Sequence, residues 1–291
     1  MRKFGDKSTC IFHDLGKSIG GFVMLNEVAK ERATLKESDI VDARTLKTSH
    51  KRLAEILQPG MTVLDVGCGT GAITSGITEM VGPNGRVIGI DNNLELIEKA
   101  RQKYKNIPGL TFEIADVYNL PYHSEFDIVT SARVLQWLEN PQTALHQMVK
   151  STKHNGQVLV LDYNHTKISW EPEIPVTMQS FYDTFLQWRS SAGMDNEIAD
   201  HLSKMFKEFE LTNIKVTDQS EMTKRSDNDF QTYITILAGV ASSKGKQMVN
   251  DGTITESQRV RAEGDFRKWI KECAKSQTMY LLAVEGTKKS D

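Results

Sequence analysis

The chain has 291 residues, of which 25% are charged and 39% hydrophobic, and its formal net charge at pH 7 is −2. This length allows one large domain or a domain with an inserted cap. A charge so close to zero gives no strong field for nucleic acid or for an anionic membrane, so we expect neither as a partner. The oligomeric state does not follow from these numbers.

No apolar run is long enough to span a bilayer, and no hydrophobic signal region follows the first residues, so we expect a cytoplasmic protein. The cysteines Cys10, Cys68 and Cys273 lie far apart and are odd in number, which favours free thiols in a reducing compartment. The histidines and cysteines show no metal-ligand spacing, so no metal site is predicted.

Residues 1–58 are expected to be a helical segment. Ile40, Leu46 and Leu53 keep one side of its last part apolar, and a Gln-Pro-Gly sequence ends the run.

The stretch from Met61 to Gly71 predicts a buried strand, a glycine loop and then a helix. Its glycines, Gly67, Gly69 and Gly71, allow a sharp turn that brings a helix N-terminus to the carboxyl edge of a sheet, where backbone N–H groups can approach a ligand. Asp65 lies inside the strand, where a carboxylate is costly to bury unless something at the strand end accepts it.

Two further strands end in acids. Asp91 ends the strand that begins at Arg86, and it suits acceptance of hydrogen bonds from two ribose hydroxyls. Asp116 ends the strand that begins at Leu110, and it suits an adenine amino group. The glycine pattern alone also fits a dinucleotide fingerprint. Dehydrogenases share an acid at the place of Asp91, but they do not usually share one at the place of Asp116.

The three acids at nearly even spacing, with the ordered sequence that follows them as far as Asp162, resemble class I S-adenosylmethionine-dependent methyltransferases. The resemblance is to the small-molecule type, similar to enzymes of ubiquinone biosynthesis. In that family the glycine loop holds the methionine part of the cofactor, the second acid the ribose and the third the adenine. The resemblance therefore implies these S-adenosylmethionine contacts: Asp65, Gly67, Cys68, Gly69, Gly71, Asp91, Asn92, Asp116 and Val117.

The resemblance also implies that residues 131–138 border the sulfonium end of the cofactor. Arg133, Gln136 and Trp137 can face cofactor or substrate from there. An N-terminal segment commonly covers the cofactor in this family, with Arg44 as the candidate for the cofactor's carboxylate; a solvated arginine is the alternative.

The segment 163–210 is where relatives insert a cap over the acceptor. Tyr163 and Trp170 are candidate substrate contacts, and His165 is the candidate base, although an exposed loop histidine is the alternative. A helix with Phe181, Phe185 and Trp188 on one side follows, and this stripe is either core or pocket wall. Nearby acids lead us to expect an apolar pocket that tolerates a cationic amine. These acids are Glu171, Glu173 and Asp183.

The predicted fold class is α/β, a Rossmann-like doubly wound seven-stranded sheet. The family ends with an antiparallel strand, and Thr278–Glu285 fits that place. We therefore expect a helical lid over 1–58 and a methyltransferase domain over 59–291, with the cap at 163–210.

The resulting hypothesis is methyl transfer from S-adenosylmethionine to a small-molecule acceptor by in-line displacement. The alternative is a catalytically silent S-adenosylmethionine-binding regulatory or partner protein. A nicotinamide-dependent dehydrogenase fits Asp116 and the terminal strand poorly. Formation of S-adenosylhomocysteine separates the first two hypotheses.

Overall fold

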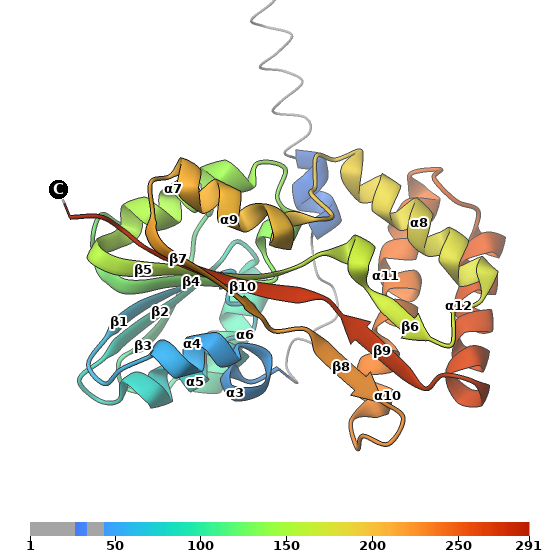
Figure 1. The fold of residues 1–291 in the computed structure, drawn as a ribbon, viewed down its shortest axis with the longest axis horizontal. Coiled ribbons are helices and arrows are strands. Elements are labelled where there is room, and N and C mark those ends of the chain that lie inside the picture. The colour runs from blue at the N-terminus through green and yellow to red at the C-terminus, as the bar shows by residue number, and fades with distance from the viewer. Residues whose placement is uncertain (1–26, 34–43, 291) are drawn as a thin grey trace, which may run out of the picture.

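The computed structural model describes residues 27–33 and 44–290. In this part of the chain, a seven-stranded sheet with helices on its faces stands beside a helical lobe (Figure 1). The rest of the predicted lid, at 1–26 and 34–43, lies outside the described residues, as does Cys10.

The main sheet confirms the predicted fold class. Five neighbouring strands, β3, β2, β1, β4 and β5, pair in parallel. β10 lies between β5 and β7 and is antiparallel to both. The strand order reverses between β1 and β4, and ligands of open α/β sheets bind at such a switch point. In sheet order the strands are β3 (Leu110–Ile114), β2 (Arg86–Asp91), β1 (Thr62–Val66), β4 (Phe126–Ala132), β5 (Thr152–Tyr163), β10 (Leu281–Thr287) and β7 (Thr212–Asp218).

Helices cover both faces of this sheet, which explains why its central strands are apolar on both sides. Leu145 and Met205 pack on one face, in a core that includes Leu64. Leu53 and Ile77 pack on the other face, in a core that includes Val63. The covering helices are α3 (Leu46–Ser49), α4 (Lys51–Ile56), α5 (Ala72–Val81), α6 (Leu94–Tyr104), α7 (Pro141–Ser151) and α9 (Ile198–Glu208).

The helical lobe has a core of its own. Phe181, Phe185 and Trp188 of the aromatic stripe are all buried there, against Phe266 and Trp269. The lobe takes one helix from the predicted cap and the others from the last third of the chain, whereas α9 packs on the main sheet. The predicted cap is thus divided between two packing units. The lobe helices are α8 (Val176–Ser190), α10 (Phe230–Ile234), α11 (Ile236–Asn250) and α12 (Glu256–Glu272).

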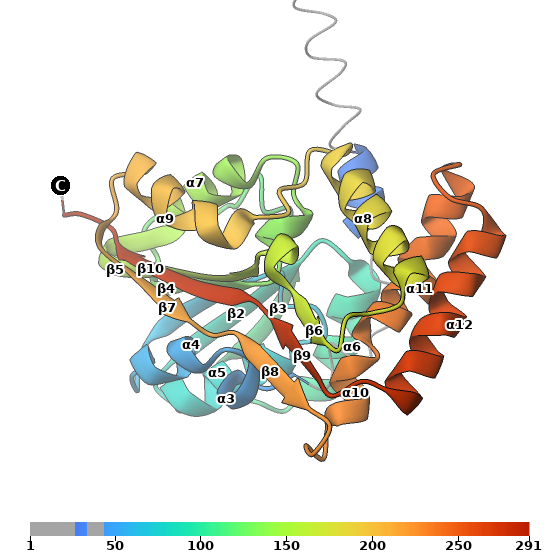
Figure 2. The ribbon, with the colours of Figure 1, turned by 45° about the vertical axis from the view of Figure 1, so that its right-hand side comes forward.

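A second, three-stranded sheet lies between the main sheet and the lobe helices (Figure 2). It is antiparallel, and the sequence did not indicate it. The predicted last strand is broken at Tyr280, so its first part joins this small sheet and the remainder joins the main sheet. The small sheet consists of β6 (Ser169–Glu171), β9 (Ser276–Met279) and β8 (Glu221–Lys224).

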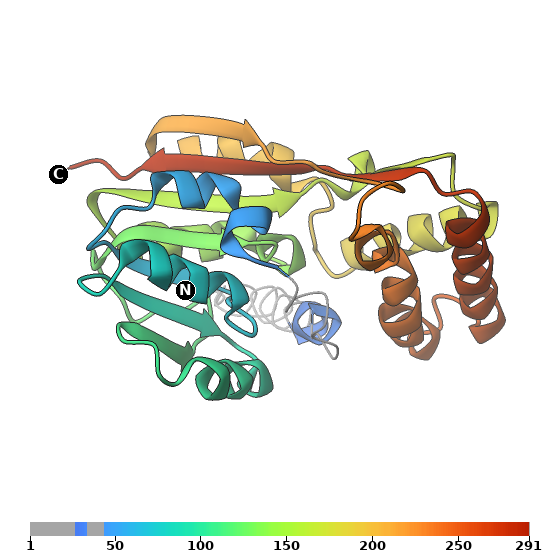
Figure 3. The same ribbon diagram turned by 90° about the horizontal axis from the view of Figure 1, so that it is seen from below.

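The helical segment 27–33 lies between the sheet and the lobe (Figure 3). Lys30 forms an ion pair with Asp116 on the sheet side, with 3.2 Å between Nζ and Oδ2. Arg32 faces the lobe, where its guanidinium carbon lies 4.3 Å from the centre of the Trp188 ring. None of the helices in the described residues is long and apolar enough to cross a membrane.

Candidate functional site

A cavity of about 1130 Å³ opens at the carboxyl ends of β1, β2 and β4. Its wall includes backbone of the glycine loop, the end of β2, the turn after β4 and the segment 27–33. Eight of the predicted site residues line it, which are Arg44, Gly67, Gly69, Asp91, Asn92, Val117, Arg133 and Trp137. Four others, Asp65, Cys68, Gly71 and Asp116, do not line it.

The glycine loop takes its shape from left-handed backbone. Gly67 and Gly71 have φ of 74° and 78°. A Cβ at Gly67 would lie 2.3 Å from Val134, and one at Gly71 would lie 2.5 Å from Phe112. Any other residue at these positions would strain the backbone and displace a packed neighbour. Gly71 therefore shapes the loop without facing the cavity.

Asp91 ties the loop to the end of β2. Its carboxylate accepts hydrogen bonds from the N–H groups of Gly69 at 3.0 Å and Asn93 at 2.9 Å. Burial raises the pKa of Asp91, and these N–H groups work against that rise. The strand end thus presents a held carboxylate to the cavity.

Asp65 is buried and accepts a hydrogen bond from the Thr74 hydroxyl at 2.7 Å. Burial raises its pKa to about 6, although the Thr74 hydroxyl lowers it. Cys68 is buried beside it as a free thiol, and burial raises its pKa too, which removes the reactive thiolate form.

Asp116 does not line the cavity, although its neighbours Ala115 and Val117 do, and it is held on two sides. Its carboxylate accepts from the Tyr118 N–H at 2.9 Å and from the Lys30 ammonium at 3.2 Å. The Lys30 contact was missed from the sequence, because 86 residues separate the two partners and no motif connects them.

A second cavity, of about 480 Å³, lies between the sheet and the lobe. It shares Arg44, Arg133 and Trp137 with the first cavity, so the two meet there. Every predicted substrate residue lines it, together with the predicted base, and these are Gln136, Trp137, Tyr163, Trp170 and His165. Side chains of α11 complete the wall, and sequence reasoning did not assign them.

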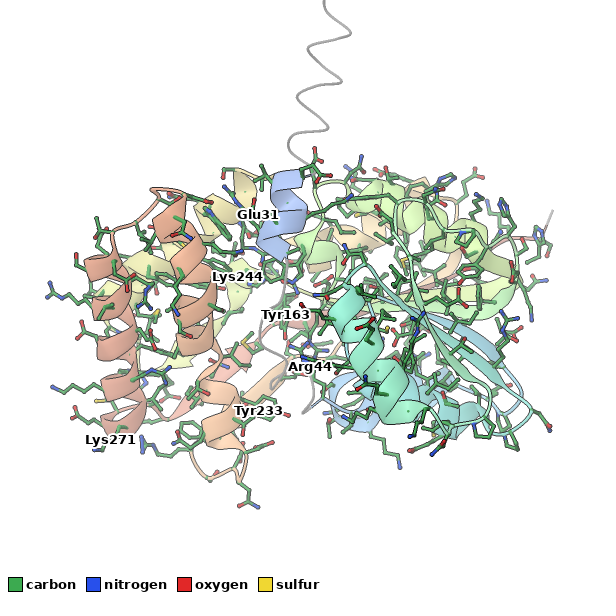
Figure 4. The ribbon with its side chains drawn as sticks, turned by 180° about the vertical axis from the view of Figure 1, so that it is seen from behind. Glu31, Arg44, Tyr163, Tyr233, Lys244 and Lys271 are labelled. Carbon is green, nitrogen blue, oxygen red and sulfur yellow. The ribbon has the colours of Figure 1, made fainter. Side chains whose placement is uncertain are left out.

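Arg133 is fixed at the junction in a left-handed conformation, with φ of 62°. Its guanidinium donates to the Tyr163 hydroxyl at 2.9 Å, to the Ser49 carbonyl at 3.0 Å and to Glu221 at 2.5 Å. Arg44 lines both cavities as well, and burial, followed by the charge of Arg133, lowers the pKa of Arg44. Figure 4 shows Arg44 near Tyr163.

His165 is buried, so the alternative of an exposed loop histidine is wrong. Its Nε2 lies 2.5 Å from the Gln136 side-chain oxygen, and its Nδ1 lies 3.3 Å from the Tyr182 hydroxyl. Since an amide oxygen only accepts, Nε2 carries the proton and Nδ1 is an acceptor, beside a Tyr182 hydroxyl that donates to the His165 carbonyl at 3.0 Å. Burial, followed by the charge of Arg189, lowers the pKa of His165 well below its ordinary value.

The expectation of acids in the second cavity is wrong. Glu171, Glu173 and Asp183 are exposed and line neither cavity. The sequence placed them near the aromatic stripe, but Asp183 lies on the exposed side of α8, and Glu171 and Glu173 lie before that helix and are exposed too. Among the described residues, no group of three histidine, cysteine or acidic side chains is arranged to hold a metal ion.

The comparisons with known proteins agree with this geometry. A family model described as "Methyltransferase domain" matches residues 57–214, which is more than half of the chain. The demethylmenaquinone methyltransferase of Lactococcus lactis is 30% identical over 151 residues, covering 51% of this chain and 55% of that protein. This chain spans about half the length of the curated relatives it matches.

Solved structures share the fold at lower identity. A Haemonchus contortus phosphoethanolamine N-methyltransferase, solved with S-adenosylhomocysteine, superposes with a TM-score of 0.53 at 13% identity, covering 83% of this chain and 52% of that one. The [4+2]-cyclase SpnF superposes with a TM-score of 0.51 at 16% identity, covering 95% and 96%. At such identities the likeness shows the fold alone.

Proposed function

Because this chain belongs to the methyltransferase-domain family, we propose that it transfers a methyl group from S-adenosylmethionine to a small-molecule acceptor. The observation that carries this proposal is the meeting of two cavities at Arg44, Arg133 and Trp137. The wall of one cavity includes the glycine loop and Asp91, and the wall of the other includes several aromatic side chains. A donor and an acceptor held in them would meet at the shared wall.

The donor groups of the first cavity suit S-adenosylmethionine. Asp91 offers a carboxylate for ribose hydroxyls, and the backbone of Gly67 and Gly69 can approach the methionine part closely. Val117 would pack against the adenine, with Asp116 beyond it. When bound, this cofactor supplies an electrophilic methyl group on a sulfonium.

Arg44 is suited to hold an anionic group at the junction. It lines both cavities, and in the described part of the chain no carboxylate lies within ion-pair distance of it. We assign it to the cofactor's carboxylate in the first cavity, with Arg133 holding the junction in place through Ser49, Tyr163 and Glu221.

Positioning is the main demand of such a transfer. Holding the two reactants in line contributes roughly 7–11 kcal/mol through proximity and orientation, whereas a general base adds on the order of 10²–10⁴-fold in rate. His165 would serve as that base only for an acceptor that carries a proton on its nucleophilic atom, and it would take the proton at Nδ1, beside Tyr182. Gln136 fixes the imidazole from the other side.

Label transfer tests the proposal. The protein is incubated with methyl-labelled S-adenosylmethionine and a metabolite extract, and the labelled product and S-adenosylhomocysteine are measured. We expect one labelled small molecule, formed together with S-adenosylhomocysteine, and less product with Asp91→Ala at the same limiting cofactor concentration. Label in RNA, DNA or protein would overturn the small-molecule assignment.

The silent binding protein is the other outcome of this test. The cyclase of the same fold illustrates that the fold alone does not specify methyl transfer. S-adenosylmethionine that binds tightly but yields no S-adenosylhomocysteine with any fraction of the extract would favour that alternative.

A further inference from the structure

We propose that Arg189 is a positioning residue of the second cavity and that it orients His165 by holding two of its partners, Gln136 and Asn196. This rests on the proposed function, because it takes His165 as the base for an acceptor that releases a proton. Arg189 belongs to α8 and is fully buried, although it lines neither cavity. It therefore acts on an acceptor only through the residues that it holds.

The guanidinium of Arg189 binds two residues at once. Its Nη2 donates to the Gln136 carbonyl at 2.8 Å, and its Nε donates to the side-chain oxygen of Asn196, also at 2.8 Å. A guanidinium is planar and its donors point in fixed directions, so one side chain sets the positions of both partners. Gln136 follows β4 and Asn196 precedes α9, so Arg189 joins segments that are distant in the chain.

Gln136 is held on its other side by a buried acid. Its N–H donates to the Asp162 carboxylate at 3.1 Å, and Asp162 is fully buried in β5. Burial raises the pKa of Asp162 to about 7, while N–H donors and the charge of Arg189 lower it. Both backbone groups of Gln136 are therefore bound to buried side chains, which fixes the place of this residue.

The side chain of Gln136 is fixed as well, and it orients the imidazole of His165. Its amide nitrogen donates to the Arg133 carbonyl at 3.1 Å. Because a carbonyl only accepts, the amide nitrogen must face Arg133, and the amide oxygen must face His165. That oxygen lies 2.5 Å from Nε2 of His165. The proton is therefore held at Nε2, and the lone pair is left at Nδ1.

Asn196 holds the backbone of His165. Its carbonyl accepts from the His165 N–H at 2.7 Å, and its side-chain nitrogen donates to the Leu186 carbonyl at 2.9 Å. The Tyr182 hydroxyl donates to the His165 carbonyl at 3.0 Å. Leu186 and Tyr182 belong to α8, as Arg189 does. The place of His165 thus depends on this helix of the lobe, although His165 itself follows β5.

Arg189 also contacts the shared wall and influences the charge of the imidazole. Its guanidinium carbon lies 4.4 Å from the centre of the Trp137 ring, and Trp137 lines both cavities. Burial, followed by the charge of Arg189, lowers the pKa of His165 and keeps its imidazole neutral. A neutral imidazole carries its proton on one nitrogen or on the other. The positioning role of Arg189 therefore predicts a measurable property, which is a single tautomer of His165.

The tautomer of His165 tests this inference without any acceptor. Nitrogen-15 NMR of the histidine side chains near pH 7 distinguishes a proton on Nε2 from a proton on Nδ1, and His165→Gln assigns the signals. In the unsubstituted protein we expect the Nε2–H tautomer in at least tenfold excess. A smaller excess, or a majority of the Nδ1–H tautomer, would overturn the inference.

Variants of Arg189 show whether this residue is the cause. Arg189→Lys keeps a positive charge, but its single ammonium does not replace a fork that reaches both Gln136 and Asn196. Arg189→Met removes the charge as well. We expect both variants to lower the tautomer excess at least threefold while S-adenosylhomocysteine affinity stays within threefold. If Arg189→Met does not fold, Arg189→Lys carries the test.

Arg225→Met is the matched control. The guanidinium of Arg225 also holds two partners in the lobe, the carbonyls of Ala274 and Ile270, each at 2.6 Å. It too lies over a ring, with its guanidinium carbon 5.6 Å from the centre of Phe230, and it lines neither cavity. We expect Arg225→Met to leave the tautomer of His165 unchanged.

Kinetics with an acceptor found by label transfer give a second readout. If that acceptor releases a proton, Arg189→Lys should lower kcat at least tenfold. The KM for S-adenosylmethionine should stay within threefold, because Arg189 does not line the first cavity. An unchanged kcat with such an acceptor would contradict the positioning role.

The outcomes separate this inference from the proposed function. If Arg189 variants that bind S-adenosylhomocysteine keep the tautomer excess, or if Arg225→Met loses it as well, the positioning role is overturned and the methyltransferase proposal stands. If no S-adenosylhomocysteine forms with any acceptor while the Arg189 variants alone lose the tautomer excess, the function proposal fails and the hold of Arg189 on His165 stands.

Discussion

At the scale of single residues, the two buried acids of the glycine loop region have different tasks. Asp91 uses its charge to hold N–H groups at a cavity wall. Asp65 is enclosed, bonded to Thr74 and raised in pKa to about 6 by burial. The Asp91 carboxylate is therefore available to a ligand, whereas burial of the charged Asp65 carboxylate destabilises the folded state.

Asp91→Ala should weaken binding of S-adenosylhomocysteine at least tenfold. A hydrogen bond to a charged group is worth roughly 1.5–3 kcal/mol, and ribose hydroxyls would lose this acceptor. Calorimetry on the folded variant checks this, with the exposed Asp183→Ala as control. Unchanged affinity in Asp91→Ala would remove the ribose assignment.

Asp65→Asn should stabilise the protein at pH 8 by about 1–3 kcal/mol. The folded pKa of about 6 lies above the value near 3.9 of an unfolded chain, so the folded state keeps a proton that the unfolded state has lost between these values. The contribution of Asp65 to stability thus falls as the pH rises through this window.

Urea unfolding at pH 4 and pH 8 measures the free energy of unfolding of Asp65→Asn and of the unsubstituted protein. The difference between the two should be small at pH 4. Asparagine still accepts the Thr74 hydrogen bond, so Thr74 is not left without its partner. Because Asp65 does not line the cavity, S-adenosylhomocysteine affinity should stay within threefold in the same variant. A larger loss of affinity would show that Asp65 has a part in holding the cofactor.

At the scale of elements, the segment 27–33 connects the sheet to the lobe. Arg32 donates to the Trp188 carbonyl and to the Ser191 hydroxyl, and it forms an ion pair with Asp251. Because the segment lines the first cavity, it is suited to cover a bound cofactor and exclude water.

Hydrogen exchange at residues 27–33 should slow when S-adenosylhomocysteine is added. Arg32→Ala should remove this protection and speed ligand dissociation several-fold, because it releases the segment from α8 and α11. Arg261→Ala, at an exposed position of α12, is the matched control. Equal exchange with and without ligand would contradict a covering role.

The elements also show how far the sequence could be interpreted. The strands and the glycine loop were predicted because their apolar runs, glycines and terminal acids are local signals. The small sheet was not predicted, because its strands are short and come from three distant parts of the chain. Residues 278–285 form one mostly apolar run, which predicts a single strand. The break at Tyr280 arises only because the two parts of this run pair with different sheets.

The candidate site shows the same division. Arg133, Gln136, Trp137, Tyr163 and Trp170 were found from their place after core strands, and all line a cavity. Lys30 and Lys244 were missed, since a lysine on a helix is ordinarily solvated and only the tertiary fold brings these two inward. The charge of the second cavity was misjudged for the same reason.

At the scale of the whole molecule, the sheet and the lobe have separate cores. A substitution that destabilises one core should therefore affect the other core less. Phe266 in the lobe and Phe126 in the sheet are both fully buried. Phe266→Ala should destabilise by about 3–5 kcal/mol and raise hydrogen exchange in α8, α11 and α12. It should leave S-adenosylhomocysteine affinity within threefold.

Phe126→Ala is the matched variant in the sheet, and it should lower S-adenosylhomocysteine affinity. Exchange mass spectrometry and calorimetry on the two variants compare them directly. Equal loss of cofactor binding in both would mean that the sheet and the lobe unfold as one unit.

The division of the lobe along the chain has a consequence for synthesis. The ribosome makes α8, with its buried Phe181, Phe185 and Trp188, before the helices that cover these rings. At about 5–20 residues per second, the aromatic side of α8 waits several seconds for α11 and α12. A nascent chain that pauses after β7 and before α10 would present that side to solvent or to a chaperone, while its main sheet lacks only β10.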